Sequence, residues 1–260
     1  MSTANNRYPG ATIRLSYFLV VLAALPGCST LPAESSAEIP DLRQPSAVLR
    51  EDAEYPLDIY DPLEPFNRVV YKFNAQFDEY VFLPLVDLYE FITPPFMQTA
   101  ISNFFSNLVE ITTFINSLLQ LKLEKTGQTG ARFIINSTVG LAGFWDPAKR
   151  LGIPHHWEDF GQTLGYYGLG PGPYLVLPIL GPSNLRDGTG RLVEGFTYGT
   201  LLNEVFDFDD HTAAEITFYT VGAVDQRHKI EYRYYETGSP FEYDLIRYMY
   251  TKKREIEIAK

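Results

Sequence analysis

Residues 96–121, FMQTAISNFFSNLVEITTFINSLLQL, carry the clearest helical pattern in the chain. Apolar side chains recur along this stretch in steps of three and four residues, or as adjacent pairs, which places them on one face of an α-helix. The sequence therefore predicts a long amphipathic helix here. The members of the apolar face are Ile101, Phe104, Phe105, Leu108, Ile111, Ile115, Leu118 and Leu119.

The other face of this helix carries a polar stripe that is almost free of charge. A helix that faces water on a soluble protein usually carries Lys and Glu there. Two interpretations stay open: the stripe packs against another layer of protein, or it lines a narrow wet passage. The stripe consists of Asn103, Asn107, Glu110, Thr113, Ser117 and Gln120, and all but the last are the candidate channel-lining residues.

Further segments share the helical period or carry helix start and stop signals, so we expect a mostly helical protein. No long alternating strand pattern and no internal repeat occurs. The expected helices are residues 61–84, with Asp61 as the cap and Pro62 in the first turn, then 126–144, 184–202, 210–236, and 240–258 with Ser239 as the cap.

Residues 160–185 contain no charge, yet Gly and Pro interrupt them repeatedly. A regular membrane-spanning helix cannot be built from such a segment, because irregular backbone facing lipid would leave amide groups unpaired. We therefore expect an apolar, broken segment that is covered by protein or lies at an interface.

The amino-terminal segment has the features of an export signal. Arg7 and Arg14 precede an apolar stretch that is too short to span a bilayer comfortably. Leu25-Pro-Gly-Cys28 follows and resembles a lipobox, in which the cysteine becomes the lipidated amino terminus after cleavage. Ser29 after the cysteine suggests sorting to the outer membrane of a Gram-negative bacterium.

These features predict three parts of the chain. Residues 1–27 are a lipoprotein signal peptide, and Cys28 is the lipid anchor. Residues 28–60, rich in Pro and acidic side chains, are a flexible tether. Residues 61–260 form a single helical domain.

Composition narrows the class of protein. The 260-residue chain has a formal net charge of −11, so it lacks the clustered positive charge that binds nucleic acid. Aromatic residues make up 15% of the chain, which argues for a folded protein. The single cysteine rules out a disulfide or a thiolate metal cluster within one chain. Contact with lipid would have to use apolar surface.

The segment His155-His156-Trp157-Glu158-Asp159 is the densest group of ionisable side chains of catalytic type. Adjacent side chains on an extended segment point to opposite faces, and no HExxH, GxSxG or P-loop pattern occurs. We therefore expect no catalytic residue and no metal ligand, and we expect that the protein is not an enzyme. A lipid-modifying enzyme that uses this segment stays as an alternative, which the variant His156→Ala would test.

Several blocks occur in an order that resembles the MlaA (VacJ) family, over about residues 58–250. The blocks are Asp61-Pro-Leu-Glu-Pro-Phe-Asn-Arg68, Ser102-Asn-Phe-Phe-Ser-Asn107 with Glu110, Arg132-Phe-Ile-Ile-Asn-Ser137 with Gly140, Glu158-Asp-Phe-Gly-Gln-Thr-Leu-Gly165, Gly170-Pro-Gly-Pro-Tyr174 with Leu177-Pro178, and Gly181-Pro-Ser183 followed by Leu185-Arg-Asp187.

The resemblance implies an all-α fold, a ring or disc of amphipathic helices embedded in one membrane leaflet with a central hydrophilic channel. It implies a protein of the outer membrane, lipid-anchored on the periplasmic-leaflet side, that associates with a trimeric porin. It further implies a protein that removes mislocalised phospholipid from the outer leaflet and passes it to a soluble periplasmic carrier of the MlaC type. Phe73 and Asn74 match a stretch thought to tune channel opening, which makes them candidate gating residues.

We expect no cofactor besides the covalent lipid on Cys28, and phospholipid is the transported ligand. A different class of function stays open as the alternative. A structural lipoprotein that stabilises a porin or envelope complex would need the same amphipathic surface without moving lipid.

Overall fold

The structure is a computed structural model that describes residues 59–206 and 212–260. These residues all belong to one compact unit, Ile39–Lys260. The expected signal peptide, Cys28 and nearly all of the expected tether lie outside the described residues, so the predictions on them stay predictions.

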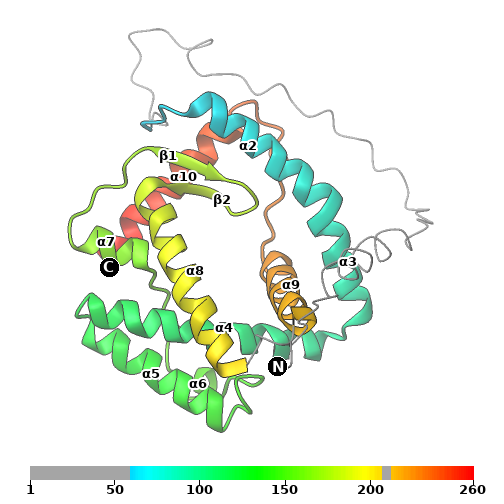
Figure 1. The fold of residues 1–260 in the computed structure, drawn as a ribbon, viewed down its shortest axis with the longest axis vertical. Helices are drawn as coiled ribbons and strands as arrows, with labels where there is room; N and C mark the ends of the chain where they lie inside the picture. Colours follow the sequence, from blue (N-terminus) through cyan, green and yellow to red (C-terminus); the bar gives the residue numbers. More distant parts are fainter. Residues whose placement is uncertain (1–58, 207–211) are drawn as a thin grey trace, which may run out of the picture. The chain divides into compact units, whose positions relative to one another are not determined.

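Most described residues lie in helices, in agreement with the predicted class (Figure 1). The elements are α2 (Glu64–Phe77), the π-helix η2 (Asp78–Phe82), α3 (Leu83–Ile92), α4 (Pro95–Leu119), α5 (Leu123–Thr138), α6 (Pro147–Arg150), α7 (Phe160–Tyr166), β1 (Tyr174–Leu177), β2 (Gly181–Asn184), α8 (Leu185–Phe206), α9 (Thr212–His228) and α10 (Glu242–Ala259).

The first predicted helix is real, but its two boundaries are wrong. The helix does not stop near Pro84, because the chain continues from α2 through the π-helical turn η2 directly into α3. Pro84 lies in the first turn of α3, where its missing amide hydrogen costs no hydrogen bond. Asp61 does not cap the helix. Its carboxylate instead accepts hydrogen bonds from Asn67 Nδ2, at 2.8 Å, and from the hydroxyl of Tyr243.

The helix predicted for residues 126–144 ends six residues early, at Thr138. Leu141, Ala142 and Gly143 all have positive φ angles, and the amide of Gly143 returns to the carbonyl of Asn136 at 2.8 Å. A Cβ at Gly140 would lie 2.3 Å from the carbonyl oxygen of Trp145. This close approach shows why the chain folds back here and cannot continue as a helix.

The two last predicted helices also differ at their ends. The helix predicted for 210–236 ends at His228 in α9, and the final helix begins at Glu242. Ser239 is not its cap residue, although its Oγ accepts a hydrogen bond from the amide of Phe241 at 3.2 Å.

The apolar, broken segment contains a β-hairpin that the sequence did not predict. Strands β1 and β2 pair antiparallel with Tyr174 opposite Asn184 and Leu177 opposite Gly181. Two asparagines of α2, two helical turns apart, bind the free edge of β1. Asn67 donates to the carbonyl of Tyr174 and accepts from the amide of Val176, and Asn74 donates to the carbonyl of Leu177 at 2.9 Å. Helix α2 thus takes the place of a third strand.

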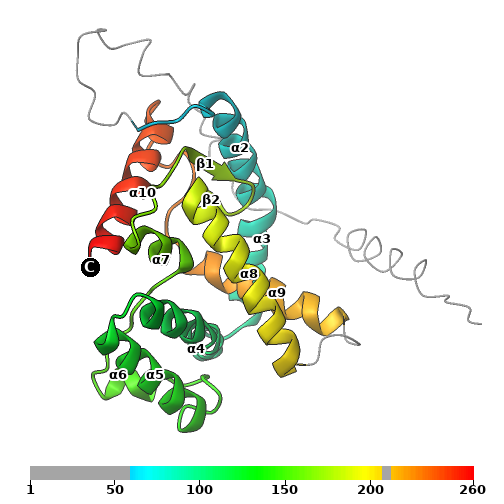
Figure 2. The same cartoon turned by 60° about the vertical axis from the view of Figure 1, so that its left-hand side comes forward.

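Contacts between the elements close into a circuit. Helix α3 contacts α9, α9 contacts α4, α4 contacts α7, and α7 contacts α10. Helix α10 contacts β2, and β1 returns to α2, which continues into α3. Helix α8 packs on α7 and on the hairpin, and Figure 2 shows α4 between α7 and α8 on one side and α5 and α6 on the other.

The distribution of polar and apolar side chains is unusual for a protein surrounded by water. Buried Asn, Asp, Glu and Arg side chains outnumber buried aliphatic ones, while large apolar side chains lie on the outside. Examples of the latter are Phe91, Phe96, Leu192 and Phe196, with Phe91 88% exposed. Within the described ranges, no helix is both long and apolar enough to cross a bilayer.

We predict that Asn67→Ala lowers the free energy of unfolding by about 2–4 kcal/mol, because it leaves the backbone groups of Tyr174 and Val176 buried without partners. Urea denaturation of the mature protein in detergent measures this. The control is Gln76→Ala, an exposed change on the same helix, which we expect to stay within about 0.5 kcal/mol of the wild type. Equal effects of the two changes would contradict the role given to Asn67.

Candidate functional site

Three neighbouring cavities lie along α4, two of them beside α8 and the third beside α5 and residues 146–155. The first, of about 250 Å³, lies between α4, α8 and residues 157–159. The second, of about 440 Å³, lies between α4, α8 and α9, and shares Val109, Trp157 and Tyr198 with the first. The third, of about 540 Å³, borders α4 and residues 146–155, and shares Ser106 with the second.

The walls of these cavities change in character from one to the next. Aromatic rings line the second cavity, with Phe105, Tyr198, Phe218 and Tyr219 around it. Polar and charged side chains dominate the third cavity: Asn103, Ser106, Arg132, Asp146, Lys149 and His155. Such a path offers apolar and polar surface side by side, as an amphipathic ligand requires.

Helix α4 turns a face toward the cavities that is not its polar stripe. Ser106, Val109 and Thr112 border the first two cavities. Asn107, Glu110, Thr113 and Ser117 are each at most 3% exposed, on the side where α4 packs on α5. Of the five candidate lining residues, Asn103 borders the third of these cavities, and the other four are buried against protein. A channel-lining role for the five residues stays a prediction.

Charged groups hold α4 against α5. Arg132 Nε donates to Glu110 Oε1 at 2.6 Å, and its Nη2 donates to Asp146 Oδ2 at 2.9 Å. Burial raises the pKa of Glu110, although the hydrogen bond from Arg132 opposes this. Burial also acts to raise the pKa of Asp146, but hydrogen bonds from the amide of Lys149 and from Arg132 outweigh it and hold that pKa below its usual value. The buried polar stripe therefore depends on Arg132 for its charge balance.

The two histidines lie on different neighbours, as expected for an extended segment. His156 Nε2 is 2.5 Å from Gln128 Oε1, and His155 Nε2 is 3.6 Å from Glu110 Oε1. Burial is the main cause that lowers the pKa of both rings. The positive charge of Arg132 lowers the pKa of His155 further, and that of Lys125 lowers the pKa of His156 further. Among the described residues, no three His, Cys, Asp or Glu side chains gather as metal ligands would.

The two candidate gating residues occupy different environments on α2. Asn74 is buried and holds the hairpin, since its Oδ1 also accepts from the amide of Ile179 at 2.7 Å. Phe73 is half-exposed and stacks on Phe77 with ring centres 6.0 Å apart. Asn74 therefore couples α2 to the hairpin on which α8 packs, and a gating role for the pair stays a prediction.

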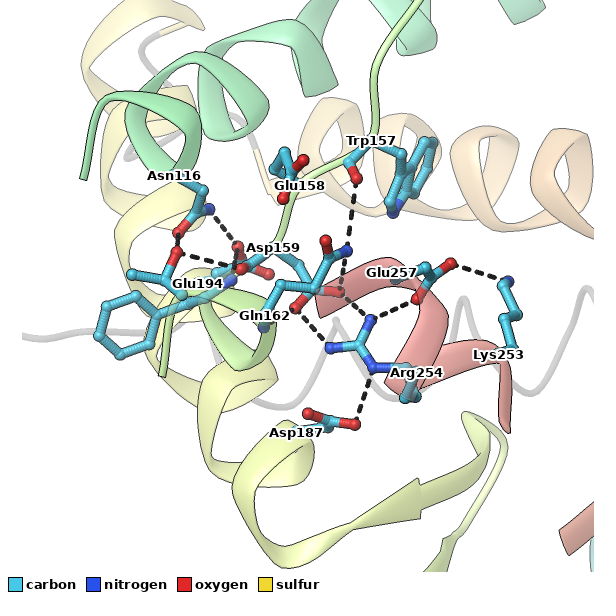
Figure 3. Close-up of polar contacts among 12 residues, drawn as sticks. Asn116, Trp157, Glu158, Asp159, Gln162, Asp187, Glu194, Lys253, Arg254 and Glu257 are labelled. Carbon is cyan, nitrogen blue, oxygen red and sulfur yellow. Dashed lines mark hydrogen bonds and ion pairs between the residues drawn. The ribbon is translucent and has the colours of Figure 1, made fainter. Parts of the chain in front are cut away.

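An ion-pair network positions the segment that forms one wall of the first cavity (Figure 3). Asp159 caps α7 by accepting from the amide of Gln162 at 2.8 Å. Arg254 of α10 donates to both oxygens of Asp159, at 2.6 and 2.8 Å, and its Nε donates to Asp187 of α8 at 2.8 Å. One guanidinium thus joins α7, α8 and α10 next to Trp157 and Glu158.

The same network shifts the pKa of its carboxylates. Burial acts to raise the pKa of Asp159 and of Asp187. Hydrogen bonds from Arg254 to Asp159, and from Arg186 and Arg254 to Asp187, outweigh burial and hold both pKa values below the usual range. Both groups are therefore held as carboxylates at neutral pH, which keeps the salt bridges to Arg254 intact.

Glycines bring α7 and α8 into backbone contact beside this network. A Cβ at Gly190 would lie 2.6 Å from the amide nitrogen of Gly161, and a Cβ at Gly161 would lie 2.6 Å from Asp187 Oδ1. Any larger residue would push the two helices apart and move the wall of the first cavity.

These observations describe a mostly helical protein that buries charged side chains, exposes large apolar ones and has neighbouring apolar and polar cavities along α4. A family model for the MlaA lipoprotein matches residues 59–257, nearly all of the described chain. The chain belongs to the MlaA lipoprotein family.

Relatives and a solved structure agree with this assignment. The chain is 40% identical over 154 residues to an uncharacterized protein of Rickettsia prowazekii, which covers 59% of this chain and 61% of that protein. It is 37% identical over 143 residues to the intermembrane phospholipid transport system lipoprotein MlaA of Escherichia coli K12. This match covers 52% of this chain and 56% of that protein. The matches thus span less than two thirds of these relatives.

A solved structure described as the structural basis for maintenance of bacterial outer membrane lipid asymmetry superimposes with a TM-score of 0.61 and 26% sequence identity. The match covers 77% of this chain and 100% of that chain.

Sequence reasoning missed most of the cavity wall. Trp157 lies in the segment His155–Asp159, which the sequence singled out for its ionisable side chains and not as a cavity wall. Glu194 and Tyr198 lie on α8, and no pattern in the sequence marked them. Asp159 and Asp187 do lie in two of the blocks that resemble the family, Glu158–Gly165 and Leu185–Asp187. Those blocks were the available signal for a site around Arg254.

We predict that Arg254→Met costs about 3–5 kcal/mol of stability at neutral pH, because it removes both guanidinium bonds of Asp159 and leaves the buried Asp187 with Arg186 as its one cation among the described residues. The pKa values of Asp159 and Asp187 are lowered in the folded protein, so the wild type keeps this stabilisation above about pH 4 and loses it as the pH falls further. The gap between wild type and variant should therefore narrow in acid. Urea titrations at several pH values measure it, and a constant gap would contradict the prediction.

We predict that Gly190→Ala destabilises the protein by about 1–3 kcal/mol, because the methyl group meets the backbone of α7. Gly195→Ala on the same helix is the control, since a Cβ there has no atom within 4 Å and should stabilise the helix by up to about 1 kcal/mol. Thermal unfolding of both variants distinguishes close packing from helix propensity. Equal destabilisation by the two changes would contradict the close packing of α7 and α8 at Gly190.

Proposed function

We propose that this protein removes mislocalised phospholipid from the outer leaflet of the outer membrane and passes it to a soluble periplasmic carrier. It acts by moving lipid and makes or breaks no bond. The single observation that carries the proposal is the set of three neighbouring cavities along α4. The aromatic one lies beside α8 and α9, and the polar one lies beside α5 and residues 146–155.

The chemistry of this path suits a phospholipid. Acyl chains gain free energy where they leave water for apolar surface, and the ring-lined second cavity provides such surface. A phosphate and its headgroup need hydrogen-bonding partners, which the third cavity offers through Asn103, Lys149 and His155. A wall that mixes both signs of charge also permits release, since transport requires binding weak enough to reverse.

The exterior supports a place within a membrane leaflet. Large apolar side chains cover the outward faces of α2 and α3, including Phe66, Val69, Leu88 and Phe91. A surface of this kind is costly in water and favourable in lipid. Because the described helices lack a spanning segment, lipid on Cys28 would supply the anchor.

The names of the relatives point in the same direction. The Escherichia coli relative is named as a lipoprotein of an intermembrane phospholipid transport system, and the matching structure concerns outer membrane lipid asymmetry. A trimeric porin and an MlaC-like carrier are the partners that this proposal adds. The alternative is a structural lipoprotein that stabilises a porin or envelope complex, and the apolar exterior favours it as much as transport.

The test is the amount of phospholipid exposed on the surface of intact cells that lack the protein, with wild type or Cys28→Ser supplied back. We expect surface phospholipid to rise in its absence and to return to normal only with the wild type, because the unlipidated variant cannot stay at the membrane. Porin trimers, measured in the same cells, serve as the control. Unchanged surface phospholipid together with a loss of porin trimers would establish the structural alternative instead.

A further inference from the structure

The first cavity contains two opposite charges that do not neutralise each other. Arg191 and Glu194 lie one turn apart on α8 and both border this cavity. Residues three apart on a helix commonly form an ion pair. Within residues 59–206 and 212–260, however, neither side chain forms a salt bridge. The two charges are therefore available to a ligand.

The carboxylate of Glu194 is fixed by bonds to a single oxygen (Figure 3). Its Oε1 accepts from Asn116 Nδ2 at 2.8 Å and from the amide of Phe160 at 2.7 Å. Its Oε2 accepts no hydrogen bond from the described residues and is not enclosed. The side chain is thus held in place with one oxygen free.

The electrostatic surroundings of Glu194 lack a nearby cation of its own. Burial raises its pKa, and the negative charge of Asp159 raises it further, while the hydrogen bonds from the amide of Phe160 and from Asn116, followed by the charge of Arg254, only partly oppose them. Arg254 is itself bound to Asp159, and the other acidic residue of this wall, Glu158, is paired with Lys122 and Lys125. A cation placed in the cavity would meet an unbalanced carboxylate.

Arg191 provides the complementary group at the other end of the pair. Among the residues that the structure describes, its guanidinium makes one hydrogen bond, from Nη1 to the carbonyl of Leu180 at 3.4 Å, and its other donors have no partner there. Two aromatic side chains, Trp157 and Tyr198, line the same cavity. Aromatic faces attract alkylammonium ions, and a guanidinium binds phosphate oxygens in pairs.

From these features we propose that the first cavity binds the headgroup of a zwitterionic phospholipid, with the phosphodiester on Arg191 and the primary ammonium on Glu194 between Trp157 and Tyr198. This inference rests on the proposed function, which supplies phospholipid as the ligand. The volume of about 250 Å³ equals that of roughly eight waters. It suits a phosphoethanolamine group and is too small for acyl chains, which would extend into the adjoining ring-lined cavity.

The arrangement also discriminates against an anionic headgroup. A glycerol headgroup offers its phosphate to Arg191 but brings no positive charge to Glu194, so the carboxylate would stay unbalanced beside a second anion. Discrimination that depends on a buried, unpaired polar group is stronger than discrimination by shape. The cavity should therefore favour phosphatidylethanolamine over phosphatidylglycerol.

The test is native mass spectrometry of the purified lipidated protein in detergent, incubated with equimolar phosphatidylethanolamine and phosphatidylglycerol of the same chain length. We expect the wild type to bind the ethanolamine lipid at least about fivefold more often, and Glu194→Gln to lose this preference, because the amide keeps the acceptor for Asn116 and Phe160 but not the charge. Glu79→Gln, an exposed loss of the same charge on η2, should leave the preference unchanged.

Competition with soluble headgroups shows which part of the lipid is recognised. Glycerophosphoethanolamine should displace bound lipid, and glycerophosphoglycerol should displace it at least about fivefold less well. Equal displacement by both, or an unchanged preference in folded Glu194→Gln, would overturn the headgroup inference. A wild-type protein that binds both lipids equally would overturn it too while leaving lipid transport intact, whereas a wild type that binds no phospholipid would count against transport itself.

Discussion

The rest of the structure depends on the salt bridges of Arg254, which join three segments far apart in the sequence. Its guanidinium binds the residue that caps α7 and an aspartate in the first turn of α8, and it comes from α10 near the end of the chain. Because α7 and α8 touch through Gly161 and Gly190, the network fixes both helices at their closest point. Segment 157–159, and with it one wall of the first cavity, takes its position from this junction.

Burial of charge around such junctions explains why the exterior can be apolar. Arg132, Arg227, Arg247 and Arg254 each bind carboxylates inside the fold, and Glu242 accepts hydrogen bonds from Tyr71, Tyr232 and Thr237. These contacts give the chain specific packing where its aliphatic clusters are small. A fold held by internal polar contacts does not need water on its outer surface, which is what a place in lipid requires.

The sequence predicted helices well where one face is uniformly apolar, as in α4. It did not predict features that depend on side chains from another part of the chain. The polar stripe of α4 could pack on protein or line a passage, and the choice lay with Arg132 on α5, which periodicity does not reveal. The hairpin escaped notice because Asn67 and Asn74 of a helix complete it. The wall of the second cavity combines Trp157, Tyr198 and Ser106, which come from three different segments. A pattern within one segment therefore could not predict this cavity.

If the protein moves phospholipid as proposed, the lipid should pass between α4, α8 and α9. The most direct measurement places the photoreactive amino acid benzoylphenylalanine at Tyr198, which borders the first two cavities, and at Tyr60, which is 73% exposed outside them, and identifies the products after irradiation in living cells. We expect phospholipid adducts at position 198 well above those at position 60. Adducts that are equally rare at both positions, in folded protein, would contradict it.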